Sequence, residues 1–158
     1  CNLGLVPSAA QPVPVIENWA HALKTDGLLF LTHFGLDTLA EIIGYLKTCN
    51  IAVESPFADM HDLGDMLFHH GFYDPVMDTA KLELAYTRAE TFWQDMDTLG
   101  IWAVLQFTDE AAARAAVNEG FAQGLLHTVT LETVYGHAVK KLQMPENENV
   151  VQFYPRRR

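Results

Sequence analysis

Cysteine is scarce in this sequence, and this scarcity argues against a secreted domain stabilised by disulfides. Among 158 residues only Cys1 and Cys49 occur, too few for the disulfide framework of a small secreted domain. This composition suits a reducing compartment, so we expect a cytoplasmic protein. Because unpaired cysteines are among the most often buried residues, we expect Cys49 to be a buried free thiol.

Basic residues are also few, and long apolar runs are absent. The chain has 10 Lys and Arg against 20 Asp and Glu, for a net charge of -10. That balance argues against nucleic acids and anionic membranes as partners, since both select basic surfaces. The basic cluster at 156–158 ends a polar segment, where a solvated terminus is the simplest interpretation. No apolar stretch is long enough to cross a bilayer, and the first residues do not resemble a signal peptide.

Several motifs with a known chemistry are absent. The sequence has no G-x-G-x-x-G, P-loop, G-x-S-x-G or H-E-x-x-H string, so it offers no obvious phosphate loop, nucleophile elbow or zinc helix. Three of its seven histidines, His61, His69 and His70, fall in one predicted helix. His61 and His69 are too far apart along that helix to hold one ion. We predict no metal site.

What the sequence does have is 49% hydrophobic residues, enough for a substantial core, and one especially informative stretch. After the turn signal Asp26-Gly27, an apolar run from Leu28 continues to Phe34 and is broken by Gly35. Unbroken apolarity predicts a strand buried on both faces, and hence a parallel sheet with helices on each side. Ligands bind beyond the carboxyl ends of such strands. We therefore expect function in the loop 33–38.

The remaining pattern predicts an α/β domain over residues 1–142 and a polar, mobile tail over 143–158. Thr38 and Glu41 are spaced as a capping box, with Asp37 as an alternative N-cap. Further caps are expected at Asp59, at Thr87 with Glu90, and at Thr108, while 48–58 reads as a loop and 101–107 stays unassigned. Helices are expected at about 15–24, 38–47, 59–70, 88–99 and 109–120, and strands at 1–5, 28–34, 72–78, 81–86 and 127–139.

Two strings, F-G-L-D-T-L-A-E at 34–41 and D-M-H-D-L-G-D-M-L at 59–67, carry a resemblance to a known family. Together with 2–5, 27–30 and 134–138, they resemble the carboxy-terminal part of class I S-adenosylmethionine-dependent methyltransferases. The type is the malonyl-[acyl-carrier protein] O-methyltransferase of biotin synthesis. The same strings are similar to those of a mitochondrial complex I assembly factor, a methyltransferase relative that hydroxylates an arginine.

The resemblance implies a fold and a partner set. The fold is the carboxy-terminal portion of a Rossmann-like sheet, strands four to seven with flanking helices, in which 28–34 is strand five. It implies S-adenosylmethionine as cofactor of the full-length parent, and an acyl-carrier protein or small carboxylate as substrate. The family's glycine-rich cofactor loop would lie upstream of Cys1, so we expect this chain alone to be inactive. The strand at 2–5 would have an open edge, which predicts a homodimer through that edge.

The resemblance also implies site residues. Asn2 would border the methyl-transfer centre, with His33 as a second catalytic candidate, and Asn2 and Leu3 would touch the cofactor. The loop residues Gly35 and Thr38 also have a purely structural interpretation, as a turn glycine and a helix cap. The substrate-side candidates are Gly35, Asp37, Thr38, His61, Tyr135 and His137. For His61 the alternative is a helix start, and for Tyr135 and His137 it is strand packing.

Two departures from the family pattern stand out. Val6-Pro7 follows Leu5 where the family usually continues with Gln-Trp, and Leu36 stands where it usually has proline. These departures and the absent cofactor loop leave a second interpretation of the chain open, that of a binding or assembly module without catalysis.

Overall fold

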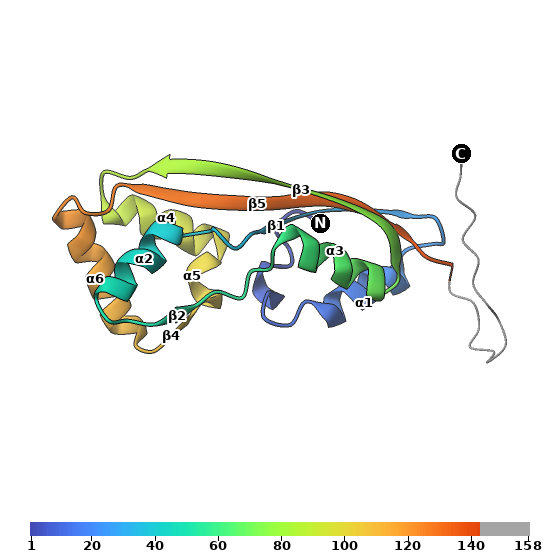
Figure 1. The fold of residues 1–158 in the computed structure, drawn as a ribbon, viewed down its shortest axis with the longest axis horizontal. Helices are drawn as coiled ribbons and strands as arrows, with labels where there is room; N and C mark the ends of the chain where they lie inside the picture. The colour runs from blue at the N-terminus through green and yellow to red at the C-terminus, as the bar shows by residue number, and fades with distance from the viewer. Residues whose placement is uncertain (143–158) are drawn as a thin grey trace.

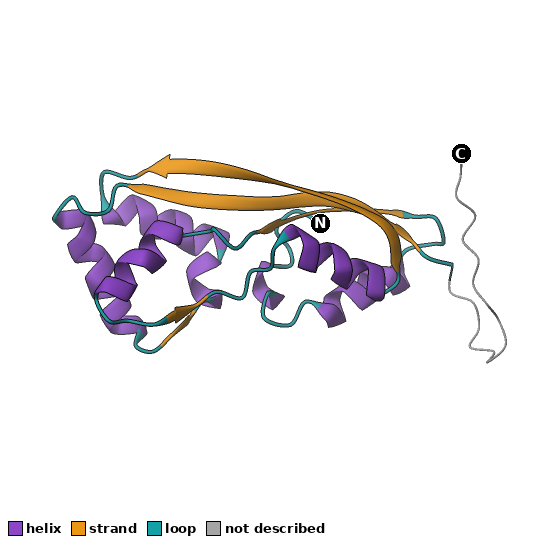
Figure 2. Cartoon of the chain, in the orientation of Figure 1, coloured by secondary structure: helices purple, strands orange, loops and turns teal. Residues whose placement is uncertain are grey.

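The structure is a computed structural model, and it describes residues 1–142. It is a mixed α/β fold in which long strands lie against two groups of helices (Figures 1 and 2). The helices are η1 (Val6–Ser8), α1 (Val13–Ala22), α2 (Ala40–Thr48), α3 (Met60–His69), α4 (Ala89–Leu99), α5 (Ile101–Val104) and α6 (Glu110–Ala122). The strands are β1 (Leu28–Phe34), β2 (Val53–Glu54), β3 (Phe72–Ala85), β4 (Gln106–Phe107) and β5 (Thr128–Lys140).

The main sheet is antiparallel, which corrects the prediction of a parallel one. Its order is β1-β5-β3, and β5 pairs antiparallel with both neighbours. Among residues 1–142, parallel pairing occurs only in an isolated bridge between Asn2 and Thr32 at the free edge of β1. The predicted strand at 2–5 is therefore limited to this bridge, because Leu3 turns away with a φ of 55°. β2 and β4 form a separate two-stranded sheet.

Helices cover only one side of the long β3–β5 ribbon in Figure 1. β1 accordingly alternates rather than being buried on both faces: Leu29 and Leu31 are buried, while Leu28 and Phe30 are 53% and 61% exposed. The strand was predicted in the right place, but its two-sided burial was wrong. An apolar run reads as two-sided burial even when half of its side chains lack a covering layer.

Two hydrophobic cores lie along the sheet. One joins α1 and α3 to β1 and β5 through residues such as Ile16, Leu63 and Val134. The other joins α2, α4, α5 and α6 through residues such as Ile42 and Phe92. The segment 86–127 between β3 and β5 supplies most of the second core, so the β3–β5 pair connects the two.

Helix ends were predicted with mixed success. Asp59 caps α3, accepting hydrogen bonds from the N–H groups of His61 (2.7 Å) and Asp62 (2.8 Å), and Gly71 follows with a φ of 104°. Gly100 ends α4 as expected, with a φ of 69°.

The other predicted caps are wrong. α2 begins after Leu39, whose φ is 63°, without a side-chain cap. The predicted box at Thr87 and Glu90 is also absent, because α4 has no side-chain cap. α6 is capped by Asp109 rather than by Thr108.

Several segments differ from the sequence expectation. The two predicted strands at 72–78 and 81–86 are one strand, β3, with a register shift between Tyr73 and Val76. The predicted loop at 48–58 contains β2, and the unassigned stretch 101–107 contains α5 and β4. Short strands of two residues carry too little periodicity to be detected in sequence.

Cys49 corrects another expectation. It follows the end of α2 and is exposed rather than buried, as is Cys1. The predicted tail at 143–158, with its basic cluster, lies outside the described residues, so the division at residue 142 stays a prediction.

Candidate functional site

Asn2 lies at a hollow on the helix-free side of the sheet. The Thr32 hydroxyl donates to the Asn2 side-chain oxygen, and the Leu3 N–H donates to the Thr32 carbonyl at 3.1 Å. These bonds fix the first residues against the edge of β1. The hollow has a volume of about 460 Å³ and is lined by Cys1, Asn2, Phe30, Leu31, Thr32, Tyr135, Gly136 and His137.

Tyr135 and His137 point into this hollow rather than into the core. They pair with Thr32 and Phe30 across β1 and β5, so their side chains lie on the same face as Asn2's partner. The Tyr135 hydroxyl donates to Asp78 at 3.2 Å, and the charge of Asp78 raises the pKa of that phenol. The structure thus brings three predicted site residues, Asn2, Tyr135 and His137, together at one hollow. The His137 ring also lies 5.7 Å from the Phe30 ring, and the site role of both residues stays a prediction.

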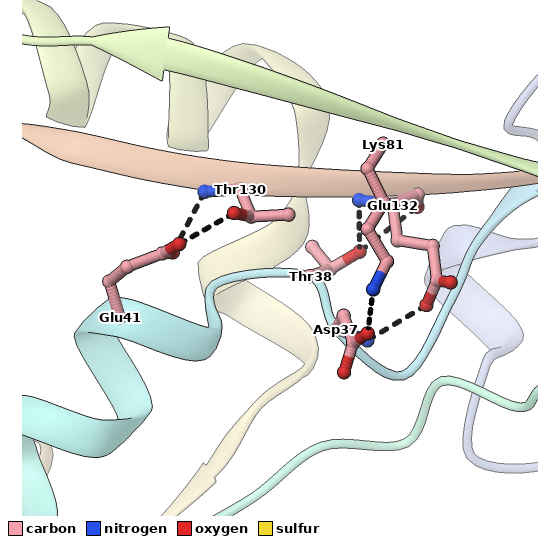
Figure 3. Close-up of polar contacts among 6 residues, drawn as sticks. All are labelled: Asp37, Thr38, Glu41, Lys81, Thr130 and Glu132. Atoms are coloured by element: carbon pink, nitrogen blue, oxygen red, sulfur yellow. Dashed lines mark hydrogen bonds and ion pairs between the residues drawn. The ribbon is translucent and has the colours of Figure 1, made fainter.

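The loop after β1 is held by one residue of β5, Glu132 (Figure 3). The Gly35 N–H donates to the Glu132 carbonyl, and the Asp37 N–H donates to the Glu132 carboxylate, both at 2.9 Å. The Thr38 hydroxyl donates to the Glu132 carbonyl at 3.1 Å and lies 3.3 Å from the Glu132 N–H, which donates to it. Gly35, Asp37 and Thr38 therefore form one cluster, organised by a residue that the sequence analysis missed.

A second carboxylate ties α2 to the same strand. Glu41 accepts hydrogen bonds from the N–H and the hydroxyl of Thr130, as Figure 3 shows. Burial alone would raise the pKa of Glu41, but the two bonds from Thr130 outweigh it and hold the pKa below its usual range. Thr38 and Glu41, predicted to cap a helix, instead attach that helix to β5.

Lys81 of β3 reaches across to Asp37 and forms an ion pair with it. Both side chains are about half exposed, so the pair contributes little stability. The hydrogen bond to Asp37 and the negative charge of that carboxylate raise the pKa of the Lys81 ammonium. Three elements therefore bring charged groups together at this loop: Lys81 comes from β3, Glu132 from β5 and Asp37 from the loop itself.

His33 is close in sequence to this loop, but its side chain points into the molecule. It is 2% exposed, and its ring meets that of Phe57 edge-on at 5.6 Å between centroids. Burial lowers the pKa of His33 to about 4, so the imidazole is neutral near pH 7. Its Nδ1 atom is buried without a hydrogen-bond partner, which fits an internal position beneath the loop.

His61 lies apart from both groups. It is in the first turn of α3, with its side chain 77% exposed and 3.7 Å from the Asp59 carboxylate. The structure therefore supports the helix-start interpretation of this residue and does not bring it near Asn2 or the loop at 35–38.

The sequence analysis did not identify four residues that hold this region together, because the sequence gives little sign of their role. These residues are Thr32, Lys81, Thr130 and Glu132. Thr130 and Glu132 alternate with apolar residues on a strand, which in sequence reads as an ordinary solvent-facing side. Only the register of β5 against β1, with Phe34 opposite Thr133, brings Glu132 beneath Gly35.

Neither a metal nor a membrane site emerges from the described part of the chain. Residues 1–142 contain no group of three or more His, Cys, Asp or Glu side chains that could hold a metal ion. Over the same residues, none of the helices has both the length and the apolar character needed to cross a membrane.

The hollow at Asn2 does not by itself fit S-adenosylmethionine. It is open to one side, and none of its lining residues is a carboxylate that could accept hydrogen bonds from ribose hydroxyls. The described residues could border such a cofactor at Asn2 and Leu3 but not enclose it.

No family model matches the chain, but individual relatives do. It is 33% identical over 148 residues to the malonyl-[acyl-carrier protein] O-methyltransferase of Methylovorus sp., covering 85% of this chain and 49% of that protein. The protein of the same name from Gallionella capsiferriformans is 38% identical over 127 residues, covering 75% and 43%. The mitochondrial arginine-hydroxylase NDUFAF5 of Dictyostelium discoideum is 29% identical over 85 residues, covering 49% and 20%.

The chain spans about half the length of the curated relatives it matches. That coverage is consistent with the predicted resemblance to one part of these enzymes. The chain is thus homologous to the malonyl-[acyl-carrier protein] O-methyltransferases.

Proposed function

We propose that this chain is the substrate-side part of an S-adenosylmethionine-dependent methyltransferase that methylates the carboxyl group of malonyl-[acyl-carrier protein] in biotin synthesis. The observation that carries the proposal is the identity of 33–38% to three enzymes of that name. The activity belongs to the whole protein, since the chain spans about half of these relatives.

Methyl transfer to a carboxylate requires mainly that the carboxylate oxygen be aligned with the methyl group. A carboxylate is already a nucleophile at neutral pH, so methyl transfer needs positioning of its oxygen and no strong base. Asn2 would border the reacting groups, while the loop at 35–38, held by Glu132, would form the rim that receives the acceptor. Tyr135 and His137 would supply polar atoms on the substrate side. The buried, neutral His33 would support the loop from beneath.

We also propose that Asn2, β1, β3 and β5 correspond to strands four, five, six and seven of the methyltransferase sheet. The parallel bridge from Asn2 to Thr32 supports this assignment. Mixed sheets commonly carry an antiparallel strand beside parallel ones, as β5 lies here between β1 and β3. The proposal also includes a homodimer through the edge at 2–5, a cytoplasmic location, and an acyl-carrier protein or small carboxylate as partner.

A chimera tests the function. This chain replaces the 148-residue region that it matches in the Methylovorus enzyme, and methyl transfer from S-adenosylmethionine to malonyl-[acyl-carrier protein] is measured. We expect transfer, a loss of rate in Asn2→Ala, and no change in Thr91→Ala, which alters an exposed position of α4. A folded chimera that binds the cofactor but transfers nothing would refute the proposed substrate.

The second candidate is the arginine-hydroxylase or assembly-factor type of relative, favoured by the match to the Dictyostelium protein. It predicts that the chimera modifies an arginine-containing peptide and leaves malonyl-[acyl-carrier protein] unchanged. Calorimetry of this chain alone with S-adenosylmethionine tests whether the chain has a complete cofactor site, which neither candidate function expects. Tight binding would overturn the inference that its cofactor site is incomplete.

A further inference from the structure

One side of β5 holds both ends of the loop that follows β1. Glu132 and Thr130 are two residues apart on β5, so their side chains lie on the same face of the sheet. Glu132 accepts hydrogen bonds from the start of the loop, at Gly35 and Asp37. The Thr130 carbonyl accepts one from the Leu39 N–H at the end of the loop, at 2.8 Å. The loop is therefore fixed at both ends to a single strand.

The loop ends in a backbone conformation that leucine rarely adopts. Leu39 has a φ of 63° and a ψ of 28°, in the left-handed region, where a Cβ atom is crowded by the backbone. Its side chain is fully buried in the core that α2, α4, α5 and α6 share. A strained residue of this kind persists only where its surroundings over-determine it, and such residues cluster at functional sites. The bond from β5 and the buried side chain supply that constraint here.

Glu132 uses its main chain and its side chain for different parts of the loop (Figure 3). Its carbonyl accepts from the Gly35 N–H and the Thr38 hydroxyl, whereas its carboxylate accepts from the Asp37 N–H. The main-chain bonds survive a substitution at this position, but the carboxylate bond does not. Because the Asp37 carboxylate pairs with Lys81 of β3, the Glu132 side chain also places the charged groups of the loop.

We propose that Glu132 is a positioning residue for the methyl acceptor, because it orders the loop at 35–38 before the acceptor binds. The proposal rests on the proposed function, which makes this loop the rim of the acceptor site. Glu132 acts through the Asp37 N–H and does not touch the reacting atoms. A rim that is already ordered loses less conformational freedom when the acceptor binds, so the acceptor binds more tightly.

The test compares two glutamates that are matched in burial and bonding. Glu132 and Glu41 are both partly buried, and each carboxylate accepts from a backbone N–H, at 2.9 Å and 2.8 Å. Glu41 ties α2 to Thr130 and makes no contact with the loop at 35–38 in Figure 3. Glu41→Ala therefore controls for a general loss of stability. Methyl transfer to malonyl-[acyl-carrier protein] is measured in the chimera with the Methylovorus enzyme, and urea unfolding reports the stability of each variant.

The expected result is a change confined to the acceptor. Glu132→Ala should raise the KM for malonyl-[acyl-carrier protein] at least about tenfold and leave the KM for S-adenosylmethionine unchanged. Glu132→Gln should restore most of the acceptor KM, because its amide oxygen can still accept the bond from the Asp37 N–H. Glu41→Ala should lower stability without changing either KM. Gly35→Ala displaces the same carboxylate without removing it, since its Cβ atom would lie 2.4 Å from Glu132 Oε2, and should raise the acceptor KM as well.

A second measurement needs no methyl transfer. In this chain without acceptor, the Asp37 amide should exchange its hydrogen at least about tenfold faster in Glu132→Ala than in the wild type. Exchange in Glu132→Gln and in Glu41→Ala should stay close to the wild-type rate. This measurement reports directly on whether the Glu132 carboxylate orders the loop before the acceptor binds.

Two kinds of failure are distinguishable. An acceptor KM that responds equally to Glu132→Ala and Glu41→Ala, or an Asp37 amide that exchanges at the wild-type rate in Glu132→Ala, would overturn the role of Glu132. Methyl transfer by the unsubstituted chimera would then keep the proposed function. A chimera that binds S-adenosylmethionine but transfers nothing would remove the proposed function, and with it the role of Glu132 toward this acceptor.

Discussion

Adding one methyl group at Gly35 should loosen the loop at 35–38 by displacing the Glu132 side chain. A Cβ atom at Gly35 would lie 2.4 Å from the Glu132 Oε2 atom and 2.7 Å from its Cδ and Cγ atoms. These distances are too short for contact, so the carboxylate must swing away. It then loses the hydrogen bond of 2.9 Å from the Asp37 N–H.

The expected size follows from two opposing effects. A hydrogen bond to a charged group contributes roughly 1.5–3 kcal/mol, toward the lower end here because Glu132 is only half-buried. Replacing glycine by alanine offsets roughly 0.4–1 kcal/mol of this by restricting the unfolded chain. Gly35→Ala should therefore lower the free energy of unfolding by about 1 kcal/mol, or the melting temperature by about 4 °C.

Urea unfolding measures the effect, and a double-mutant cycle tests its cause. In a Glu132→Ala background the clash and the bond are both gone, so Gly35→Ala should cost nothing. Gly44→Ala is the control, since a Cβ atom at Gly44 meets nothing within 4 Å and should raise helix stability by up to about 1 kcal/mol. Equal losses from Gly35→Ala in both backgrounds would refute the role assigned to Glu132.

Three further predictions each concern a single residue. Gly136→Ala should destabilise the chain by about 1–3 kcal/mol in urea unfolding, because its Cβ atom would lie 2.2 Å from the Val76 carbonyl oxygen; wild-type stability would contradict this. His33 has a pKa of about 4 in the folded chain, below an unfolded value of about 6.5, so stability should fall as pH drops from 6.5 toward 4. The loss should be at most roughly 3 kcal/mol, and a His33→Leu variant with an unchanged pH profile would exclude His33 as its cause. Lys140 is 4% exposed, its ammonium has no hydrogen-bond partner, and burial lowers its pKa. Lys140→Met should therefore hold or raise the melting temperature, with exposed Lys47→Met as control, and a clear fall would show that the ammonium has a stabilising partner.

The sequence was sufficient for features set by local chemistry. The strand at 28–34, the N-cap at Asp59 and the C-terminal glycines of α3 and α4 follow from short-range rules. An aspartate bonds to N–H groups two and three residues later, and a glycine accepts a positive φ, wherever the rest of the chain lies. The functional role expected of the loop 33–38 stays a prediction. Three of its residues, Gly35, Asp37 and Thr38, do form one cluster around Glu132, whereas His33 points inward.

Features that depend on distant partners were not accessible in this way. Thr38 and Glu41 have the spacing of a capping box, yet in the fold their side chains bond to Glu132 and Thr130, about 90 residues later. A hydroxyl or carboxylate takes whichever donor the register brings near. That register was not encoded in the pattern around residue 38.

The sequence by itself determined the α/β composition, the positions of most elements and the similarity to a methyltransferase half. The tertiary structure decided that β5 lies antiparallel between β1 and β3, that His33 points inward and that Tyr135 and His137 point into the hollow beside Asn2. The physical reason is that periodicity specifies which side chains share a face of a strand. Which face is covered, and by what, depends on pairing between strands about 100 residues apart.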